Sequence, residues 1–233
     1  MKILAMLPTY NEAGNILPLI NELLVLNPAL EVIVVDDNSP DGTWKLVAEL
    51  AATEPRVHLI HRTTERGRGT AGIAGFKYAR DNGYHLAIEM DADFSHHPRF
   101  IPSLLEPLQS GVADIVIGSR LVSGGGESGR HPLRRYITRA ANFYIKAMLK
   151  LPVRDCTTGF RTFNRKALEV IPWESLDANG PEIVQEVLIE ARRAGLGMIE
   201  RPILFEERRE GESTFNSGIM VRSFKYVWQN RGR

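Results

Sequence analysis

Cysteine and long apolar segments are both scarce in this sequence. Its only cysteine is Cys156, so no disulfide can form within the chain, and we expect a reducing, cytoplasmic environment. The apolar run that follows Met1 and Lys2 stops at Pro8, short of the ~7–15 residues of a signal-peptide core. No segment approaches the ~20 apolar residues that a membrane-spanning helix requires. A lipid substrate would therefore be met at the surface of a membrane.

An excess of charge of either sign is also lacking. Lys and Arg total 29 against 28 for Asp and Glu, a formal net charge of +1 at pH 7, so nothing demands a nucleic-acid partner and any basic surface must be local. The chain has 233 residues, of which 43% are hydrophobic and 24% charged. This is enough for one large globular domain with a substantial core, and we expect residues 1–233 to form it.

Short apolar runs alternate with amphipathic helical segments in the first half of the chain, which predicts an α/β fold with a mostly parallel sheet. The expected strands cover residues 3–7, 32–35, 57–60, 86–90 and 115–117. For the second half, the patterns predict a basic helix over 132–149, a loop over 155–161, a helix over 181–194, an extended segment over 198–206 and a final helix over 217–229.

Three of the expected strands run into unusually polar segments. These segments are 8–12 (PTYNE), 36–43 (DDNSPDGT) and 91–93 (DAD). Ligands of parallel α/β sheets bind beyond the carboxyl ends of the strands. The sequence therefore predicts that three strand ends present carboxylates to one edge of the sheet, where the chemistry takes place.

Asp91 and Asp93 flank one small residue directly after an apolar strand. This spacing lets two carboxylates converge on a hard divalent cation such as Mg²⁺ or Mn²⁺. A single acidic pair is also common on a solvated loop. Here Asp36, Asp37 and Glu12 end neighbouring strands, and uncompensated carboxylates do not gather unless they bind a cation or a sugar hydroxyl. The context favours a metal site.

The acidic residues of the segment 36–43 have two different predicted roles, one structural and one in ligand binding. Asp41 or Thr43 stands where the cap of a following helix is expected, so we interpret Asp41 as structural. Asp37 is the better candidate for contact with a ribose or base, because a carboxylate at a strand end accepts hydrogen bonds from hydroxyl and amino groups.

The stretch 67–72 (GRGTAG) has the glycine spacing of a dinucleotide-binding fingerprint, and Asp91 follows at a suitable distance. An oxidoreductase is therefore the main competing hypothesis. It leaves the carboxylates at the other strand ends without a role, and the polar stretch 62–66 separates the strand from the glycines. We expect instead that the glycines let a loop approach a diphosphate, with Arg66 or Arg68 offsetting its charge.

One dense basic region precedes and enters the expected helix over 132–149. Its arginines are Arg120, Arg130, Arg134, Arg135 and Arg139. It is either a solvated helix face or a phosphate site at a membrane surface, because guanidinium groups bind phosphate oxygens in pairs and anionic lipids attract basic helices. Arg134 and Thr138 lie one turn apart, where they can hold one phosphate together.

Other features carry weaker functional interpretations. His96 and His97 follow the acidic pair, but no second pair of soft ligands accompanies them, so zinc is disfavoured. We expect Cys156 to be a small buried residue rather than a nucleophile. In the final helix the apolar residues share one face, which either packs on the core or docks on a membrane or a membrane-bound partner. These apolar residues are Val221, Phe224, Val227 and Trp228.

Taken together, the motifs resemble the family 2 glycosyltransferases, and within them the dolichyl- and polyprenyl-phosphate mannosyltransferases. The resemblance spans nearly the whole chain and rests on the order and spacing of 8–12, 36–43, 91–98 (DADFSHHP), 118–120 (GSR), 155–161 (DCTTGFR), 205–208 and 211–213. It implies a GT-A fold, a divalent cation, GDP-mannose as donor, a polyprenyl or dolichyl phosphate as acceptor, and inversion at the anomeric carbon. It also implies peripheral attachment to a membrane, sometimes through small membrane-bound partner proteins.

Carried over by position, the resemblance implies a role for each matching residue. The half over 1–120 would bind the nucleotide sugar, and the half over 121–233 would shape the acceptor site. The nucleotide would be held by Pro8, Tyr10, Glu12, Val35 and Asp37. The metal and diphosphate would be held by Asp91 and Asp93, with Ala92 lying against the donor through its backbone. The transferring sugar and the acceptor phosphate would be surrounded by Arg120, Arg134, Thr138, Arg208 and Ser213. The implied catalytic residues are Asp91, Asp93 and Arg120.

The chain departs from the family pattern at several positions. The family usually has a lysine where this chain has Thr214, so a basic contact to phosphate is missing or is supplied by another residue such as Arg209. Thr138 replaces a usual serine and Arg68 a usual leucine. The start of the helix over 181–194 is also atypical, which leaves acceptor preference open.

The acceptor chemistry needs charge compensation more than a general base, because a phosphate monoester with a second pKa of about 6 is already anionic at neutral pH. Two alternatives to mannose transfer stay open on the sequence. One is a polyprenyl-phosphate transferase that uses a UDP-sugar, either glucose or N-acetylglucosamine. The other is a non-catalytic nucleotide-sugar-binding subunit altered in the loop over 212–216.

Overall fold

The computed structural model describes residues 1–206 and 217–231. Its strands are β1 (Ile3–Thr9), β2 (Leu30–Asp36), β3 (Val57–His61), β4 (Leu86–Glu89), β5 (Ile115–Ser119), β6 (Gly126–Glu127), β7 (Arg161–Asn164), β8 (Met198–Pro202) and β9 (Leu204–Phe205). Its α-helices are α1 (Ile16–Leu26), α2 (Thr43–Ala51), α3 (Arg68–Asp81), α4 (Ile101–Gln109), α5 (Pro132–Leu149), α6 (Arg165–Val170), α7 (Ile183–Arg193) and α8 (Ser217–Gln229). Short 3₁₀ helices are η1 (Pro98–Phe100) and η2 (Trp173–Ser175).

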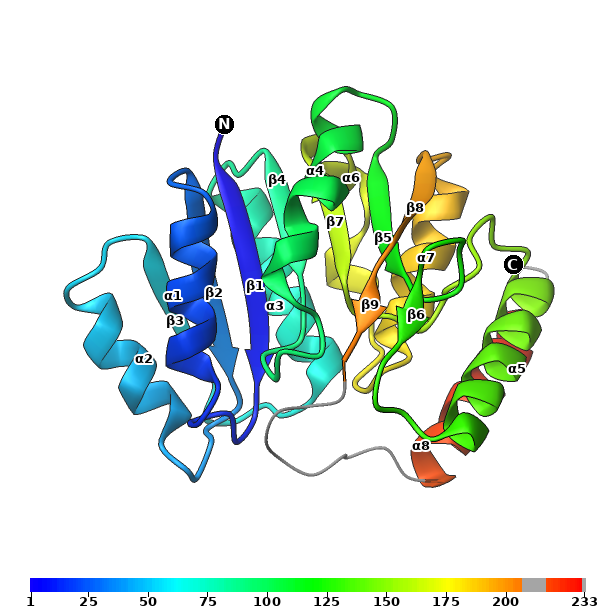
Figure 1. Ribbon diagram of the computed structural model, residues 1–233, viewed down its shortest axis with the longest axis horizontal. Helices are drawn as coiled ribbons and strands as arrows, with labels where there is room; N and C mark the ends of the chain where they lie inside the picture. The colour runs from blue at the N-terminus through cyan, green and yellow to red at the C-terminus, as the bar shows by residue number, and fades with distance from the viewer. Residues whose placement is uncertain (207–216, 232–233) are drawn as a thin grey trace.

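A seven-stranded sheet with the order β3-β2-β1-β4-β7-β5-β8 forms the centre of the fold (Figure 1). Neighbouring strands are parallel except at β7, which runs antiparallel to both β4 and β5. The predicted α/β fold with a mostly parallel sheet is therefore confirmed, and all five predicted strands are present. Strand β7 was not predicted, because its four residues RTFN contain no apolar run.

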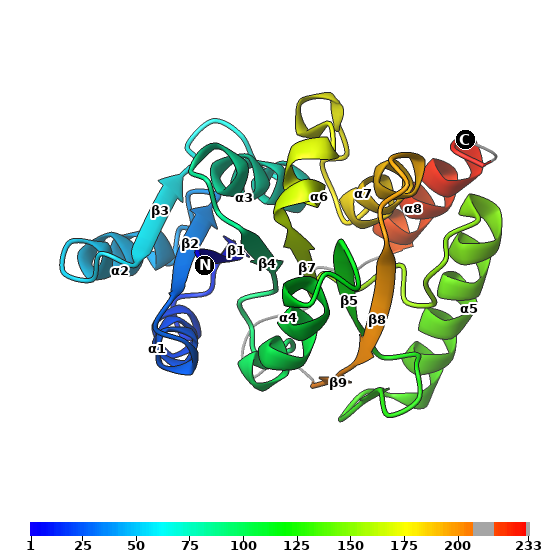
Figure 2. The ribbon, with the colours of Figure 1, turned by 90° about the horizontal axis from the view of Figure 1, so that it is seen from above.

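Both faces of the sheet are buried, which explains the continuous apolar runs in its strands. In β1, Leu4 and Met6 face a core shared with α3, α6 and α7, whereas Ile3 and Leu7 face a second core formed with α1, α2 and α4. Figure 2 shows the two groups of helices on opposite sides of the sheet. Helices thus cover both faces of the sheet. Ligands can reach it at the ends of its strands.

Helices α5 and α8 lie side by side at one end of the molecule, as Figures 1 and 2 show. The rings of Tyr144 and Phe224 lie 5.0 Å apart between them. Val227 is fully buried in the core, whereas the side chain of Trp228 is 54% exposed, so the final helix both packs on the core and presents aromatic surface. The side chain of Val221 lies outside the described residues. None of the helices within 1–206 and 217–231 is long and apolar enough to cross a membrane.

Strands from the two halves of the chain are interleaved in the central sheet. Strand β7, from the second half, lies between β4 and β5 of the first half, and β8 extends the sheet beyond β5. One hydrogen-bonded sheet therefore joins strands from both halves of the chain, between residues 3 and 202.

Candidate functional site

The polar strand ends meet at one edge of the sheet, as the strand pattern predicts. Thr9 at the end of β1 is the register partner of Asp36 at the end of β2, and Asp36 is the partner of His61 at the end of β3. On the other side of β1, Met6 pairs with Glu89, the last residue of β4. The loops that follow β1, β2 and β4 are consequently neighbours.

The loops after β1 and β2 are fixed to each other by hydrogen bonds. The backbone N–H groups of Asn11, Glu12 and Ala13 donate to the side chains of Ser39, Thr43 and Asp41, at 3.0, 2.9 and 3.0 Å. Asp41 also accepts from the backbone N–H and the hydroxyl of Thr43, at 3.0 and 2.6 Å, in the first turn of α2. Asp41 is therefore structural, although the cap position itself is Gly42, with a φ of 85°.

The two carboxylates after β2 have protein partners. Asp36 is fully buried and accepts from the hydroxyls of Thr9 and Ser39, at 2.8 and 2.6 Å. Asp37 accepts from Nε of Arg62 and from the backbone N–H of Gly67, both at 2.7 Å. The premise that these carboxylates gather without compensation is therefore incorrect for this pair, because hydroxyl, guanidinium and amide groups of the chain itself compensate them.

The residues predicted to hold the nucleotide line this edge with different exposures. Tyr10 is 46% exposed, and the guanidinium of Arg66 lies 5.7 Å from its ring centroid. Glu12 accepts from the side-chain amide of Asn15 at 2.9 Å. Pro8 is half-buried, whereas Val35 is fully buried in the core. A ligand contact at Val35 would have to use its backbone.

The second acidic segment follows β4 and lies beside these loops. Asp91 is half-buried, whereas Ala92 and Asp93 are buried. Asp93 accepts from the backbone N–H and hydroxyl of Ser95, at 3.0 and 2.6 Å. Phe94 has a φ of 63°, in the left-handed region that a bulky residue seldom adopts. Backbone strain of this kind concentrates at functional sites, which fits the role predicted for the segment.

His96 contacts the backbone of Asp91. Its ring is buried, stacks on Phe160 with centroids 5.1 Å apart, and accepts the backbone N–H of Asp91 on Nδ1 at 3.1 Å. Burial lowers the pKa of His96 despite the nearby carboxylates of Asp91 and Asp93. A neutral imidazole that accepts on Nδ1 fixes the backbone of Asp91 and forms no ion pair with its carboxylate.

An arginine lies directly on the acidic segment. Nη2 of Arg68 donates to Oδ1 of Asp91 at 2.7 Å, and Nη1 lies 3.7 Å from Oε1 of Glu89. Burial opposes the charged form of Arg68, but Asp91, Glu89 and Asp93 together raise its pKa above the ordinary value. Arg68 therefore stays positively charged in the site.

The glycines around Arg68 do not lie where we expected. A Cβ at Gly69 would overlap the carbonyl oxygen of Ala178, and one at Gly67 would overlap the side chain of Asn179. The backbone N–H of Gly69 donates to the carbonyl of Asn179 at 3.0 Å. These glycines therefore admit a segment of the same chain and not a diphosphate, and the same contacts argue against a dinucleotide fingerprint here.

The acidic segment is suited to a hard divalent cation. Asp91 and Asp93 supply carboxylate oxygens, the donor type that Mg²⁺ and Mn²⁺ prefer. Among residues 1–206 and 217–231, no three histidine, cysteine, aspartate or glutamate side chains are grouped closely enough to hold a metal ion by themselves. Protein sites for Mg²⁺ commonly use one or two carboxylates and take the remaining ligands from substrate phosphates and water. The donor set fits such a cation.

Arg120, which follows β5, is held beside this segment by a buried ion pair. Its Nε and Nη2 donate to the two carboxylate oxygens of Asp155, both at 2.7 Å, and Nη2 also donates to the hydroxyl of Thr157 at 2.6 Å. Burial disfavours both charges, yet the pairing raises the pKa of Arg120 and lowers that of Asp155, and Asp91 adds to the effect on Arg120. The arginine is thus charged and rigid.

A second arginine connects Arg120 to helix α5. Arg130 pairs with Glu127, whose carboxylate lies 3.6 Å from Arg120, and donates to the hydroxyl of Thr138 at 3.2 Å. Both guanidinium groups lie over the ring of Phe205, at 5.5 and 5.4 Å from its centroid. The predicted acceptor residue Thr138 is therefore joined to the Arg120 cluster, which we define as Arg120, Glu127, Arg130, Asp155 and Thr157.

The remaining predicted acceptor residues are less constrained. Arg134 lies on the exposed side of α5, one turn before Thr138. Arg208 and Ser213, together with Arg209 and Thr214, lie outside the described residues. Sequence reasoning missed Asp155, Glu127 and Glu89 as partners of the arginines. An acidic residue inside an apolar strand, such as Glu89 in LAIE, is a signal that a buried cation must accompany it.

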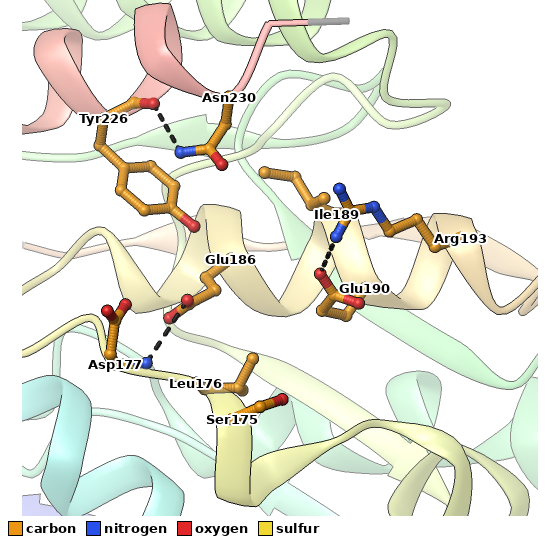
Figure 3. Close-up of a pocket in the computed structure, with 9 residues that line it drawn as sticks. All are labelled: Ser175, Leu176, Asp177, Glu186, Ile189, Glu190, Arg193, Tyr226 and Asn230. Atoms are coloured by element: carbon orange, nitrogen blue, oxygen red, sulfur yellow. Dashed lines mark hydrogen bonds and ion pairs between the residues drawn. The ribbon is translucent and has the colours of Figure 1, made fainter. Parts of the chain in front are cut away.

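A pocket of about 350 Å³ lies elsewhere, between α7, α8 and the segment 175–177 (Figure 3). Glu186 accepts from the backbone N–H groups of Asp177 and Ala178, at 3.4 and 3.0 Å, and burial raises its pKa. The lining residues include Tyr226 and Asn230 of the α8 end but none of the predicted site residues within the described ranges. Glu186 instead anchors the segment that packs on the glycines beside Arg68.

Comparison with known proteins identifies close relatives. The family model described as glycosyl transferase family 2 matches residues 5–171. Undecaprenyl-phosphate mannosyltransferase of Micrococcus luteus is 39% identical over 220 residues, which cover 94% of this chain and 90% of that protein. Polyprenol monophosphomannose synthase of Mycolicibacterium smegmatis is 38% identical over 235 residues, which cover 100% of this chain and 88% of that protein.

Solved structures share the fold. Glucosyl-3-phosphoglycerate synthase from Mycobacterium tuberculosis, in complex with Mn²⁺, UDP-glucose and phosphoglyceric acid, has a TM-score of 0.71 and 21% identity, covering 99% of this chain and 79% of its own. Mannosyltransferase PcManGT from Pyrobaculum calidifontis, in complex with GDP-Man and Mn²⁺, has a TM-score of 0.54 and 20% identity. The match covers 91% of this chain and 58% of that chain. The predicted GT-A architecture is confirmed.

Proposed function

Because the chain belongs to glycosyl transferase family 2, we propose that this glycosyltransferase moves mannose from GDP-mannose to a polyprenyl or dolichyl phosphate, with inversion at the anomeric carbon. The observation that carries the proposal is that Arg120, charged and held by Asp155, lies close enough to Asp91 of the acidic segment to interact with it electrostatically. In the sheet, β4 lies between β1 and β2, whose loops form the proposed nucleotide side, and β5, which Arg120 follows. In our proposal, this site brings two phosphorylated substrates together.

The printed names of the relatives support the sugar and the acceptor. Two proteins at 39% and 38% identity are named for transfer of mannose to undecaprenyl phosphate or for synthesis of polyprenol monophosphomannose. PcManGT, which shares the fold, binds GDP-Man and Mn²⁺. A neighbour of the same fold binds UDP-glucose and Mn²⁺, so a UDP-sugar is the alternative donor that an assay must include.

The nucleotide half of the site would hold the base and ribose. In our proposal the exposed ring of Tyr10, the carboxylate of Glu12 and the backbone at Pro8 and Val35 contact the nucleotide. The carboxylate of Asp37 would accept a hydrogen bond from the nucleotide. Its hydrogen bonds from Arg62 and from the backbone of Gly67 would keep it in place. The hydrogen bonds that join the two loops would keep this half rigid before the donor binds.

A divalent cation, Mg²⁺ or Mn²⁺, would be held by Asp91 and Asp93 and would supply charge neutralisation at the leaving diphosphate. The neutral ring of His96 fixes the backbone of Asp91, and Ser95 fixes the carboxylate of Asp93. The two acidic side chains would thus be oriented before any ligand arrives. Ala92, buried between them, would lie against the donor through its backbone.

The acceptor half would compensate the charge of the attacking phosphate. Since that phosphate is anionic at neutral pH, it needs little help from a base, and positive charge lowers its repulsion from the donor. Arg120 would provide fixed charge, whereas Arg134 and Thr138 would contact the acceptor from α5. Arg208 and Ser213 belong to this proposed set through the family resemblance alone.

The outer face of α5 and α8 would rest on the membrane that carries the lipid. On α5, Phe143 is 78% exposed, Tyr136 71% and Leu133 60%, and on α8 Trp228 is 54% exposed. Exposed arginines alternate with these side chains, and basic amphipathic helices bind anionic lipid surfaces. We therefore propose peripheral attachment at the cytoplasmic face, alone or with small membrane-bound partner proteins.

The test is transfer of radiolabelled sugar from GDP-mannose to a short polyprenyl phosphate in the presence of Mn²⁺ or Mg²⁺. Parallel reactions contain EDTA, UDP-glucose or UDP-N-acetylglucosamine. Label in the lipid phase that is lost with EDTA is the expected result. Label from a UDP-sugar alone would overturn the donor and keep the acceptor, and binding of GDP-mannose without transfer under every condition would overturn the proposed reaction.

A further inference from the structure

Arg68 forms an ion pair with Asp91, one of the two carboxylates proposed to hold the cation. It is the first residue of α3, and its side chain is 28% exposed. One guanidinium nitrogen donates to Asp91 at 2.7 Å and another lies 3.7 Å from Glu89. A cation on Asp91 and this guanidinium would therefore be like charges that need the same carboxylate.

The surrounding structure holds Arg68 in this place. Helix α3 begins where Gly67 and Gly69 pack against the segment of Ala178 and Asn179, which fixes the direction of the first turn. The absence of a side chain at Gly159 makes the necessary room, because a Cβ there would overlap Nη2 of Arg68. The contact between Arg68 and Asp91 thus depends on close packing from two separate parts of the chain.

Glu89 gives this arrangement a further electrostatic basis. Its side chain is fully buried, and within the described residues its Oε1 atom has no hydrogen-bond partner. Oε2 is bound by Arg161, so Oε1 is the oxygen that faces Arg68. A buried carboxylate of this kind requires positive charge nearby, and in this structure Arg68 supplies it at Oε1.

We propose that Arg68 competes with the divalent cation for Asp91 and releases it when the donor diphosphate binds. The diphosphate offers the guanidinium a new anionic partner of the geometry that arginine prefers. Cation binding would then depend on the nucleotide, because Asp91 becomes available to the metal only when Arg68 has moved to phosphate oxygens. Arg68 acts as a positioning residue for the proposed reaction, so the inference rests on the proposed function.

The test measures Mn²⁺ binding directly, from the electron paramagnetic resonance signal of free Mn²⁺, with and without GDP. Arg68→Leu removes the charge and keeps a good helix former. Without nucleotide, this variant is expected to bind Mn²⁺ about two- to fivefold more tightly than the wild type, as expected for the loss of a partly exposed ion pair. GDP is expected to tighten Mn²⁺ binding in the wild type and to do so less in the variant.

Two further variants make the result specific. Arg80→Leu makes the same charge change at the other end of α3, where Arg80 pairs with Glu174, and is expected to bind Mn²⁺ like the wild type. Gly159→Ala keeps all charges but displaces the guanidinium of Arg68, and is expected to tighten nucleotide-free Mn²⁺ binding in the same direction as Arg68→Leu. If circular dichroism shows that Arg68→Leu is unfolded, Gly159→Ala is used in its place to test the proposal.

The outcomes separate this inference from the proposed function. If Arg68→Leu and Gly159→Ala bind Mn²⁺ no more tightly than the wild type and Arg80→Leu, the role of Arg68 is overturned and the transferase proposal stands. If Mn²⁺ binds to none of the proteins even with GDP present, the cation site at Asp91 is overturned, and the role of Arg68 falls with it.

Discussion

The buried ion pair between Arg161 and Glu89 makes a prediction about stability. Both side chains are 0% exposed, and the two residues are register partners on β7 and β4. Nε of Arg161 donates to Oε2 of Glu89 at 2.9 Å, while burial lowers the pKa of Arg161 despite this carboxylate. Removing one member of a buried pair costs ~3–5 kcal/mol, because the other charge is left buried.

For Arg161→Met we expect a loss of about 3 kcal/mol in the free energy of unfolding, at the lower end of that range, since it leaves Glu89 with partial compensation from Arg68. For a chain of this size, this corresponds to a fall in Tm of roughly 6–12 °C. The measurement is urea unfolding followed by circular dichroism and tryptophan fluorescence. The double variant Glu89→Gln/Arg161→Met should regain about 1–2 kcal/mol, because the carboxylate charge is gone.

A surface pair provides the control for this experiment. Arg193 pairs with Glu190 on α7, with side chains 41% and 21% exposed. Arg193→Met is expected to change the free energy of unfolding by less than about 1 kcal/mol. A loss below about 1 kcal/mol for Arg161→Met as well, or a double variant no more stable than the single one, would refute the reasoning about buried charge.

Three further predictions concern the site, the cysteine and the membrane face. Asp91→Ala or Asp93→Ala should lower transfer at least about 100-fold with an unchanged circular dichroism spectrum, because each removes a proposed cation ligand; normal turnover by either variant would remove the metal assignment. Cys156 is fully buried and burial raises its pKa to about 12, so iodoacetamide at pH 8 should modify it at least about 1000-fold more slowly in the native than in the unfolded chain; rapid native labelling would contradict this. Phe143→Ser on α5 should weaken sedimentation with anionic vesicles about tenfold, whereas Val25→Ser, at an 87% exposed position on α1, should not, and equal effects would argue against this face.

The elements with long periodic patterns were predictable from the sequence. Helices α5 and α8 have the expected bounds, 132–149 and 217–229, because each carries an amphipathic repeat and α5 begins at a proline. The parallel strands were recognisable as apolar runs because both faces of the sheet are buried. Strand β7 was not predictable, since it is short and partly polar and is specified by partners far away along the chain.

The location of the candidate site was predictable, but the partners of its side chains were not. The rule that strand ends share an edge brought the acidic segments together correctly. It did not reveal that Asp37 is bound by Arg62, that Arg120 is bound by Asp155, or that Arg68 lies on Asp91. These contacts join residues 23 to 35 positions apart, and no local pattern encodes which charged group meets which.

The insertion of β7 between β4 and β5 also sets an order of events during synthesis. Arg161 follows its partner Glu89 by 72 residues, so at ~5–20 residues per second the ribosome leaves that edge of β4 unpaired for about 4–14 s. An open edge of an apolar strand is a template for pairing with other chains. The nascent chain is therefore most prone to aggregation before β7 emerges from the ribosome. A chaperone that covers the open edge of β4 would have its largest effect in this interval.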